Sequence, residues 1–292
     1  AGVDLPTAGC ADLWITPGYP HSVGAMKIGI VQLTSGPDIV ENLALAVDGL
    51  QQAAAQGARL IVFPEATSQA FDTGRLDRQA QELDGEFATG LQEAARELGV
   101  MAVAGMFRPA DTVERDGRTI NRVYNTALIT GPDVHRGYDK LHTFDAFNYR
   151  ESDTVKPGEE LVTFDVDGTT VGVATCYDIR FPTQFQDLAR AGAQVIVVPT
   201  SWMDGPEKLY QWRTLTAARA LDSTCWIVAA GQARPGGEAE AGQSSGPTGI
   251  GHSCVVGPTG RREAEAGYEP EIIVLDLDLE QVTKARRTLP VL

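Results

Sequence analysis

A short pattern in the first half of the chain recurs in the second half, and this repetition constrains the fold more than any other feature. Residues 57–66 read GARLIVFPEA and residues 192–201 read GAQVIVVPTS. Each copy lies between two stretches of helical periodicity, and two strand-like runs follow the second stretch. These four segments are 38–56, 86–98, 100–107 and 125–131 in the first half, and 182–191, 207–222, 225–231 and 252–257 in the second.

The repeated order of strands and helices predicts the architecture. A sheet of continuously apolar strands needs cover on both faces. Two related sheets can cover each other's inner faces while helices cover the outer faces. We therefore predict an α/β fold, a four-layer α-β-β-α sandwich with internal pseudo-two-fold duplication. Segment 233–251, rich in Gly, Ser and Pro, is predicted to form a long loop between two strands of the second half.

The apolar pattern begins at Met26, which the strand-like run KIGIVQL follows at once. Residues 1–25 contain no Lys or Arg and no apolar core of the kind that a secretory signal needs. We expect residues 1–25 to be a leader or appended segment outside the fold, and residues 26–292 to form one domain.

Charge and composition exclude several classes of function. The 292 residues include 24 Lys and Arg against 39 Asp and Glu, a formal net charge of −15, which argues against a nucleic-acid partner. No run approaches the roughly 18 apolar residues of a membrane-spanning helix, so no membrane partner is expected. The four cysteines form no C-x-x-C pair and the four histidines lack i, i+4 spacing. We therefore expect no metal site and a cytoplasmic protein with reduced thiols.

Polar residues that directly follow apolar strands are the candidates for chemistry, because ligands of α/β sheets gather at the carboxyl ends of strands. Glu65 ends the run RLIVFP, Cys176 ends TTVGVAT, and Lys140 lies just beyond the last strand of the first half. Cys176 precedes a predicted helix, and a helix N-terminus favours the thiolate, the form that attacks carbon. A thiol nucleophile needs a base for its proton and a cation for the developing oxyanion. Cys176, Glu65 and Lys140 could supply the nucleophile, the base and the cation.

Each candidate also has a structural interpretation. These alternatives are a solvated loop carboxylate for Glu65, a surface charge for Lys140 and a buried core residue for Cys176, as we expect for Cys225 and Cys254. Residues 242–246 fit the G-x-S-x-G pattern of serine hydrolases. They lie in loop 233–251, without the strand and helix of a nucleophile elbow, so we set this interpretation aside.

Three motifs, in order along the chain, resemble those of the nitrilase, or carbon-nitrogen hydrolase, superfamily. They are Phe63-Pro64-Glu65, Tyr138-Asp139-Lys140-Leu141-His142 and Cys176-Tyr177-Asp178-Ile179-Arg180-Phe181-Pro182. The resemblance extends from Met26 to Leu292 and implies an α-β-β-α sandwich with a Glu-Lys-Cys catalytic set.

The resemblance also implies a role for each residue. Glu65 would take the proton of Cys176 and later activate the hydrolytic water, while Lys140 and the backbone N–H of Tyr177 would hold the oxyanion. Glu151, in the loop after Lys140, resembles a second glutamate that orients the lysine and the substrate amide in many members. A solvated loop acid is the alternative for Glu151.

The residues after the cysteine favour one branch of the superfamily. True nitrilases usually have Trp and Glu there, whereas Tyr177 and Asp178 resemble the amidase branch of omega-amidases and deaminated-glutathione amidases. In that branch the arginine of the motif can meet a substrate carboxylate, which makes Arg180 the candidate anchor. The alternative for Arg180 is a structural ion pair with Asp178 or Asp187. Tyr177 and Trp202 complete the expected substrate contacts.

The resemblance predicts a cofactor-free enzyme that hydrolyses a small carboxamide to a carboxylic acid and ammonia through a cysteine thioester. An omega-amide with a free carboxylate is the favoured substrate. The alternatives are a nitrile or N-carbamoyl hydrolase of the same superfamily, or a catalytically silent binding or scaffold protein. The family generally pairs its subunits, so a homodimer or higher homo-oligomer is also expected.

Overall fold

The computed structural model describes residues 24–146 and 149–292, and its helices and strands follow the repeated order of the sequence. The first half contains β1 (Ala25–Gln32), α1 (Ile39–Ala55), β2 (Leu60–Val62), α2 (Glu86–Leu98), β3 (Met101–Arg115), β4 (Arg118–Thr130) and β5 (His135–Asp139). A linking segment contains β6 (Asp145–Ala146) and β7 (Tyr149–Arg150). The second half contains β8 (Thr163–Val166), β9 (Thr169–Val173), α3 (Pro182–Arg190), β10 (Val195–Thr200), α4 (Lys208–Ser223), β11 (Trp226–Gly231), β12 (Cys254–Val256) and β13 (Arg262–Glu265). The chain then continues through β14 (Glu271–Asp278) and α5 (Glu280–Thr288).

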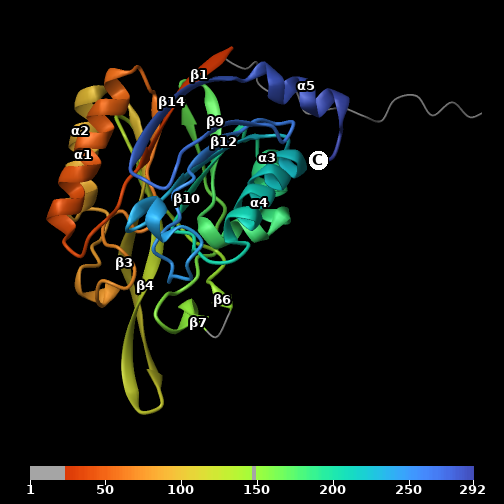
Figure 1. Cartoon of the computed structure of the whole chain (residues 1–292). Coiled ribbons are helices and arrows are strands. Elements are labelled where there is room, and N and C mark those ends of the chain that lie inside the picture. Colours follow the sequence, from red (N-terminus) through yellow and green to blue (C-terminus); the bar gives the residue numbers. More distant parts are fainter. Residues whose placement is uncertain (1–23, 147–148) are drawn as a thin grey trace, which may run out of the picture.

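The strands form two six-stranded sheets, with orders β14-β1-β2-β3-β4-β5 and β13-β12-β11-β10-β9-β8. Each sheet contains three neighbouring parallel strands, β1, β2 and β3 in one and β9, β10 and β11 in the other. Helices α1 and α2 lie outside one sheet and α3 and α4 outside the other, with both sheets between them (Figure 1). The predicted four-layer α-β-β-α sandwich with two related halves is confirmed.

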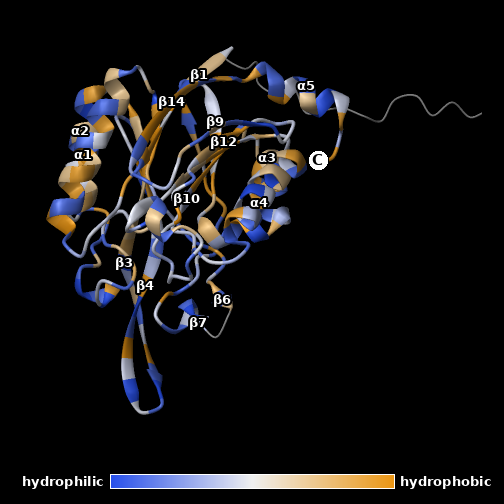
Figure 2. Ribbon diagram, viewed as in Figure 1, coloured by the Kyte–Doolittle hydropathy of each residue, from blue (hydrophilic) through white to orange (hydrophobic). Residues whose placement is uncertain are grey.

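The strands are apolar along their whole length because both of their faces are covered. Ile28, Leu60 and Val62 point into the core between the sheets, where they meet Val195 and Val197 of the other half. The alternate residues of the same strands pack under the helices in two separate clusters. Figure 2 shows the result, with hydrophobic colour along the central strands and hydrophilic residues on the outer turns of the helices.

The repeated Gly-Ala pattern ends a helix in the same way in both halves. Gly57 follows α1 with φ 90° and Gly192 follows α3 with φ 101°, backbone angles in the left-handed region that favours glycine. The next residue then donates its N–H back to the last turn, from Ala58 to Ala53 and from Ala193 to Leu188. The echo in the sequence is therefore the shared signal that ends a helix and starts the next parallel strand.

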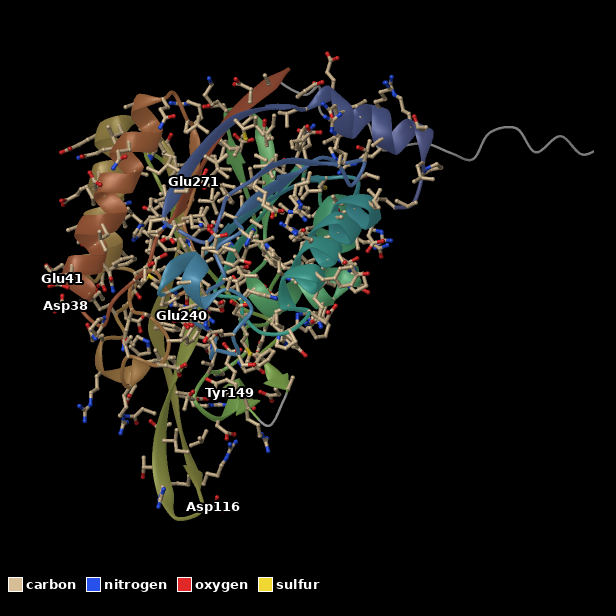
Figure 3. The ribbon with its side chains drawn as sticks, in the orientation of Figure 1. Asp38, Glu41, Asp116, Tyr149, Glu240 and Glu271 are labelled. Atoms are coloured by element: carbon tan, nitrogen blue, oxygen red, sulfur yellow. The ribbon has the colours of Figure 1, made fainter. Side chains whose placement is uncertain are left out.

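The structure departs from the sequence prediction in the hairpin of β3 and β4. Strands were expected over 100–107 and 125–131, but the ladder continues to a turn at Asp116, which lies at the tip of a projecting hairpin (Figure 3). Periodicity does not mark this extension because it has no buried face, and Arg122 pairs there with Asp111 at 2.7 Å. The register shift between Pro109 and Thr112 occurs where proline lacks an N–H.

The expected loop between two strands of the second half is present. Segment 233–251 is a long loop that contains a short 3-10 helix, Gly237–Glu240. Residues 1–23 of the expected leader lie outside the described residues, and β1 begins at Ala25. None of the helices in the described ranges has the length and apolar character needed to cross a membrane.

Candidate active site

Cys176 lies on a tight turn after β9, where it begins the 3-10 helix Cys176–Arg180 with φ 45°. Asp178 holds this turn, because its Oδ2 accepts the Thr175 N–H at 2.8 Å and the Tyr138 hydroxyl at 2.6 Å. Its Oδ1 accepts the His142 N–H at 3.0 Å. One buried carboxylate thus fastens the cysteine turn to the segment that carries Lys140.

Glu65 follows β2 and Pro64, and it points across the interface between the two halves. Its Oε2 accepts the Ser201 backbone N–H at 2.9 Å, at the end of β10 in the other sheet. Its Oε1 accepts from Lys140 Nζ at 3.1 Å. With only 1% of its surface exposed, Glu65 is not the solvated loop carboxylate that was its alternative.

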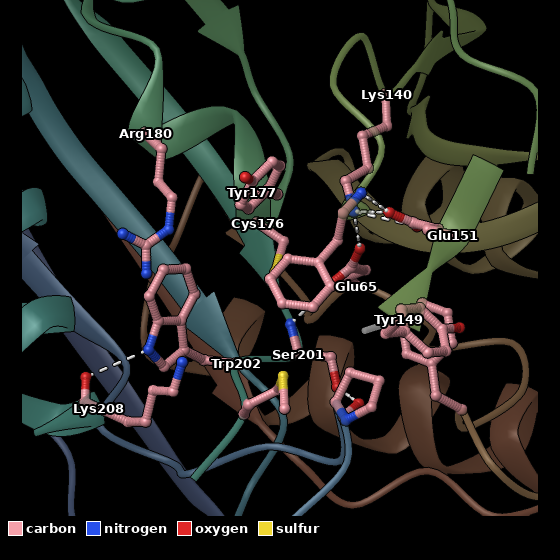
Figure 4. Close-up of a pocket in the computed structure, with 14 residues that line it drawn as sticks. Glu65, Lys140, Tyr149, Glu151, Cys176, Tyr177, Arg180, Ser201, Trp202 and Lys208 are labelled. Carbon is pink, nitrogen blue, oxygen red and sulfur yellow. Dashed lines mark hydrogen bonds and ion pairs between the residues drawn. The ribbon is translucent and has the colours of Figure 1, made fainter. Parts of the chain in front are cut away.

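Lys140 lies between two buried glutamates. Its Nζ donates to Glu65 Oε1 at 3.1 Å and to Glu151 Oε1 and Oε2 at 3.1 and 2.9 Å (Figure 4). Lys140 is 2% exposed and Glu151 3%, so neither is a surface charge. The structure therefore brings Glu65, Lys140, Glu151 and Cys176 together in one pocket.

Sequence reasoning missed Asn125, which is joined to the same cluster from β4. Its Nδ2 donates to Glu65 Oε1 at 2.8 Å and to Glu151 Oε1 at 3.1 Å. The available signal was weak: a single asparagine before the apolar run TALIT.

Burial and charge set the proton positions in this cluster. Burial raises the pKa of Glu65, Lys140 opposes this rise, and Glu151 adds to it. Burial disfavours the charge of Lys140, but Glu151 and Glu65 outweigh it and hold the pKa of this ammonium well above its ordinary value.

Burial also raises the pKa of Cys176 well above its ordinary value, and the charge of Glu65 adds to this rise. Burial and the neighbouring carboxylate thus act against the thiolate, in opposition to the effect predicted for the helix N-terminus. Cys225 and Cys254 are fully buried core residues of the second half, as expected.

The pocket encloses about 470 Å³, including its open mouth. The three expected substrate-binding residues, Tyr177, Arg180 and Trp202, all line it. The structure adds further lining residues that the sequence did not indicate: Phe71, Phe144, Tyr149, Ser201, Met203, Lys208 and Pro247. Pro247 comes from loop 233–251, and its carbonyl accepts the Ser201 hydroxyl at 2.6 Å.

Arg180 does not form either of the structural ion pairs considered as its alternative. Asp178 is engaged as described above, and Asp187 pairs with Arg190 at 2.8 Å. Arg180 instead stacks over the Trp202 ring at 5.1 Å and donates to Gln211 Oε1 at 2.8 Å. Its guanidinium faces the pocket on the side away from Lys140 (Figure 4).

Lys208, the first residue of α4, lines the same side of the pocket as Arg180 and Trp202. Its backbone carbonyl accepts the Trp202 indole N–H at 3.2 Å. Burial, together with the charge of Arg180, lowers the pKa of Lys208. The acids that line the pocket, Glu65 and Glu151, are both at its other end, beside Lys140. The pocket is thus cationic at one end and has its reactive groups at the other.

No arrangement of three or more His, Cys, Asp or Glu side chains that could hold a metal ion occurs within residues 24–146 and 149–292.

Several curated proteins are similar to this chain. A hydrolase of Mycobacterium tuberculosis is 44% identical over 276 residues, which cover 91% of this chain and 94% of that protein. The deaminated glutathione amidase of Escherichia coli O157:H7 is 35% identical and covers 86% of this chain and 90% of its own length. The omega-amidase NIT2 of Danio rerio is 31% identical, with coverage of 91% and 92%.

Solved structures agree with this similarity. Nit3 of Saccharomyces cerevisiae, a member of branch 10 of the nitrilase superfamily, superposes with a TM-score of 0.75 at 28% identity and covers 92% of this chain and 95% of its own. A mutant of the amidase from Nesterenkonia sp. AN1 superposes with a TM-score of 0.71 at 25% identity, with coverage of 91% and 96%. That structure shows covalent addition of the acetamide moiety of fluoroacetamide at the active-site cysteine.

The family model described as carbon-nitrogen hydrolase matches residues 27–287, which is nearly the whole described chain. Its match agrees with the four-layer fold and with the relatives named above. The chain therefore belongs to the carbon-nitrogen hydrolase family.

Proposed function

We propose that this enzyme is an amidase that hydrolyses a small carboxamide to a carboxylic acid and ammonia through a thioester on Cys176. The observation that carries the proposal is the convergence of Cys176, Glu65, Lys140 and Glu151 in one pocket, with both glutamates bonded to the lysine. The covalent adduct on the cysteine of the Nesterenkonia amidase supports the nucleophile.

Acylation follows from the proton positions. Glu65 takes the thiol proton as Cys176 Sγ bonds to the carbonyl carbon, and the carbonyl π electrons move to oxygen. The oxyanion accepts hydrogen bonds from Lys140 Nζ and from the Tyr177 N–H at the start of the 3-10 helix. The C–N bond then breaks, Glu65 returns the proton to nitrogen, and ammonia leaves. Glu151 orients Lys140 and the substrate amide.

Deacylation uses the same groups in the second half-reaction. Glu65 takes a proton from water as the water oxygen attacks the thioester carbon, and the same donors hold the oxyanion. The C–S bond breaks, the sulfur recovers the proton from Glu65, and the acid leaves. The raised pKa of Glu65 suits a group that both accepts and returns a proton.

The favoured substrate is an omega-amide with a free carboxylate. Arg180 and Lys208 lie at the end of the pocket away from Lys140, where they would meet an anionic acyl end. The names of the Danio rerio and Escherichia coli relatives, an omega-amidase and a deaminated glutathione amidase, support this choice over a nitrile or a carbamoyl compound.

An ammonia-release screen tests the proposal. Omega-amides of dicarboxylates, aliphatic amides, carbamoyl amino acids and nitriles are compared, with Cys176→Ala as the control. We expect ammonia and acid from the omega-amides and a trapped acyl mass adduct on Cys176. Carbon dioxide among the products would identify a carbamoyl hydrolase, and no release from any compound would support a silent binding protein.

We also propose that the protein is cytoplasmic, forms a homodimer or higher homo-oligomer, and does not need residues 1–25 for folding. The free, buried Cys176, Cys225 and Cys254 are compatible with a reducing compartment. Sedimentation of the full chain as a monomer would contradict the oligomer, and an unfolded deletion of residues 1–25 would contradict the domain boundary.

A further inference from the structure

Asn125 contacts all three buried charged residues beside the nucleophile without lining the pocket itself. Its backbone carbonyl accepts the Lys140 N–H at 2.9 Å, and its Nδ2 donates to Glu65 Oε1 at 2.8 Å and Glu151 Oε1 at 3.1 Å. The side chain is 1% exposed and lies on β4, which is fixed between β3 and β5. Asn125 is therefore held rigidly behind the cluster.

Asn125 supplies a second donor to one oxygen of each glutamate, while the other oxygens accept backbone N–H groups, Glu65 Oε2 from Ser201 and Glu151 Oε2 from Phe144. Two carboxylates are buried with one ammonium, and Lys140 Nζ already makes three hydrogen bonds to them. An ammonium has three protons, so Lys140 must turn one away from a carboxylate to reach an oxyanion. Glu65 Oε1 and Glu151 Oε1 each accept one hydrogen bond from Asn125 Nδ2 and another from Lys140 Nζ.

We infer that Asn125 is a positioning residue that keeps Glu65 Oε1 and Glu151 Oε1 hydrogen-bonded when Lys140 turns toward the oxyanion. The inference rests on the proposed function, which gives Lys140 this second task. The loss of a hydrogen bond to a buried carboxylate oxygen disfavours the charged form and favours uptake of a proton. Without Asn125, the movement of Lys140 away from Glu65 would leave Glu65 Oε1 without a hydrogen-bond donor at the step in which Glu65 acts as a base.

Asn125→Leu removes both donor protons and keeps the branched shape of the side chain, with two methyl groups in place of the amide. We expect kcat for a substrate amide to fall about 10- to 100-fold, the effect of losing a hydrogen bond to a charged group, with KM changed less than about threefold. In Asn125→Asp the new carboxyl offers at most one donor proton and, when ionised, adds a negative charge beside Glu65 and Glu151, so its kcat should also fall below that of wild type. A packing defect alone would spare Asn125→Asp, which keeps the size of the side chain.

The pH profile separates positioning from packing. Hydrogen bonds to a carboxylate lower its pKa, so their loss raises the pKa of Glu65 further, and the base form is then lost at a higher pH. The charged or titratable groups that face Glu65 are Lys140, Glu151, Cys176 and Tyr149, and all remain in the variant. The acid limb of kcat/KM should therefore move upward by about one pH unit in Asn125→Leu.

Asn121→Leu is the matched control. Asn121 lies on the same strand, and its side chain contacts Asp77 and Thr112 at the exposed hairpin, so kcat and the acid limb should stay at wild-type values. A wild-type kcat and acid limb in folded Asn125→Leu would overturn the inference. If Asn125→Leu does not fold, a wild-type profile in Asn125→Asp would overturn it.

One more measurement keeps this inference distinct from the proposed function. If wild type releases no ammonia from any amide, the proposed function fails, and Cys176 alkylation by iodoacetamide then reports the cluster instead. We expect the pH at which alkylation reaches half its plateau to differ between wild type and Asn125→Leu, with Cys176→Ala as the blank. Identical alkylation profiles would contradict a link from Asn125 to Glu65.

Discussion

The two halves of the molecule share a framework but place different chemistry on it. Gly29 in β1 pairs with Ile61, and Gly172 in β9 pairs with Ile196, the matching residue of the repeat. In both halves this glycine lets the following helix approach the sheet. A Cβ on Gly29 would lie 3.0 Å from Ala53 Cβ, and one on Gly172 would lie 3.2 Å from Leu188 Cβ.

The strand ends are where the halves differ. Cys176 lies four residues after Gly172, and the equivalent residue of the first half, four residues after Gly29, is Leu33. Glu65 lies eight residues after Gly57, and the equivalent residue of the second half, eight residues after Gly192, is Thr200. Neither half carries both the proposed nucleophile and the proposed base. The duplicated fold therefore forms its site only where the two sheets meet, with Glu65 reaching the Ser201 N–H across the interface.

Removal of the nucleophile is the strongest test of this division. Cys176→Ala should reduce turnover at least about 1000-fold, because the other residues act through the sulfur. Ammonia release and acyl-adduct mass measure the effect. Cys225→Ala, at a buried thiol of the same half away from the pocket, should keep its activity. Turnover in Cys176→Ala would place the nucleophile elsewhere.

The matching test in the first half is Glu65→Gln, which keeps the shape and removes the base. We expect kcat to fall about 100- to 10,000-fold. The proposed mechanism requires ionised Glu65, and activity should therefore be lost as pH falls through its raised pKa, which places the acid limb of kcat/KM above the ordinary range of a glutamate. Thr200→Val, at the equivalent position of the other half, is the control and should keep its kcat. Equal losses in the two variants would contradict the division of roles.

The end of the pocket away from Lys140 also distinguishes the two halves, because the residues that line it, Arg180, Trp202 and Lys208, all come from the second half. Lys208→Met should raise KM about tenfold for an amide with a terminal carboxylate, and should leave a neutral aliphatic amide unchanged. Steady-state kinetics on the two substrates measure this difference. Lys284→Met on α5 is the control for loss of a surface charge. The same KM change for both amides would show that Lys208 does not select for charge.

The sequence predicted what its local pattern encodes. Repeated apolar runs indicated two related sheets, and polar residues that end such runs indicated Glu65, Cys176 and Lys140. The position of a residue at a strand end is a property of a few neighbouring letters, which explains why these predictions needed no knowledge of distant contacts.

The residues that were missed depend on contacts far apart in the sequence. Asn125 bonds Glu65, 60 residues away, and Glu151, 26 residues away, from within a strand. Lys208 starts a helix like many surface lysines, and only the packing of α4 against Trp202 turns it toward the pocket. The burial that acts against a Cys176 thiolate has a related origin, since burial is set by the whole fold and a sequence motif does not display it.

The smallest predicted effect concerns the glycines that the halves share. In Gly29→Ala the new methyl meets Ala53 and Ala58 Cβ atoms at 3.0 and 3.2 Å, which are fixed to α1 and its following turn, so we expect a loss of about 1–2 kcal/mol in the free energy of unfolding. In Gly172→Ala the nearest fixed atoms, Leu188 Cβ and Ala193 Cβ, lie slightly farther away at 3.2 and 3.3 Å, so the loss should be smaller by about 0.5 kcal/mol. Urea unfolding measures both. A larger loss in Gly172→Ala would show that the two helices are not held to their sheets in equivalent ways.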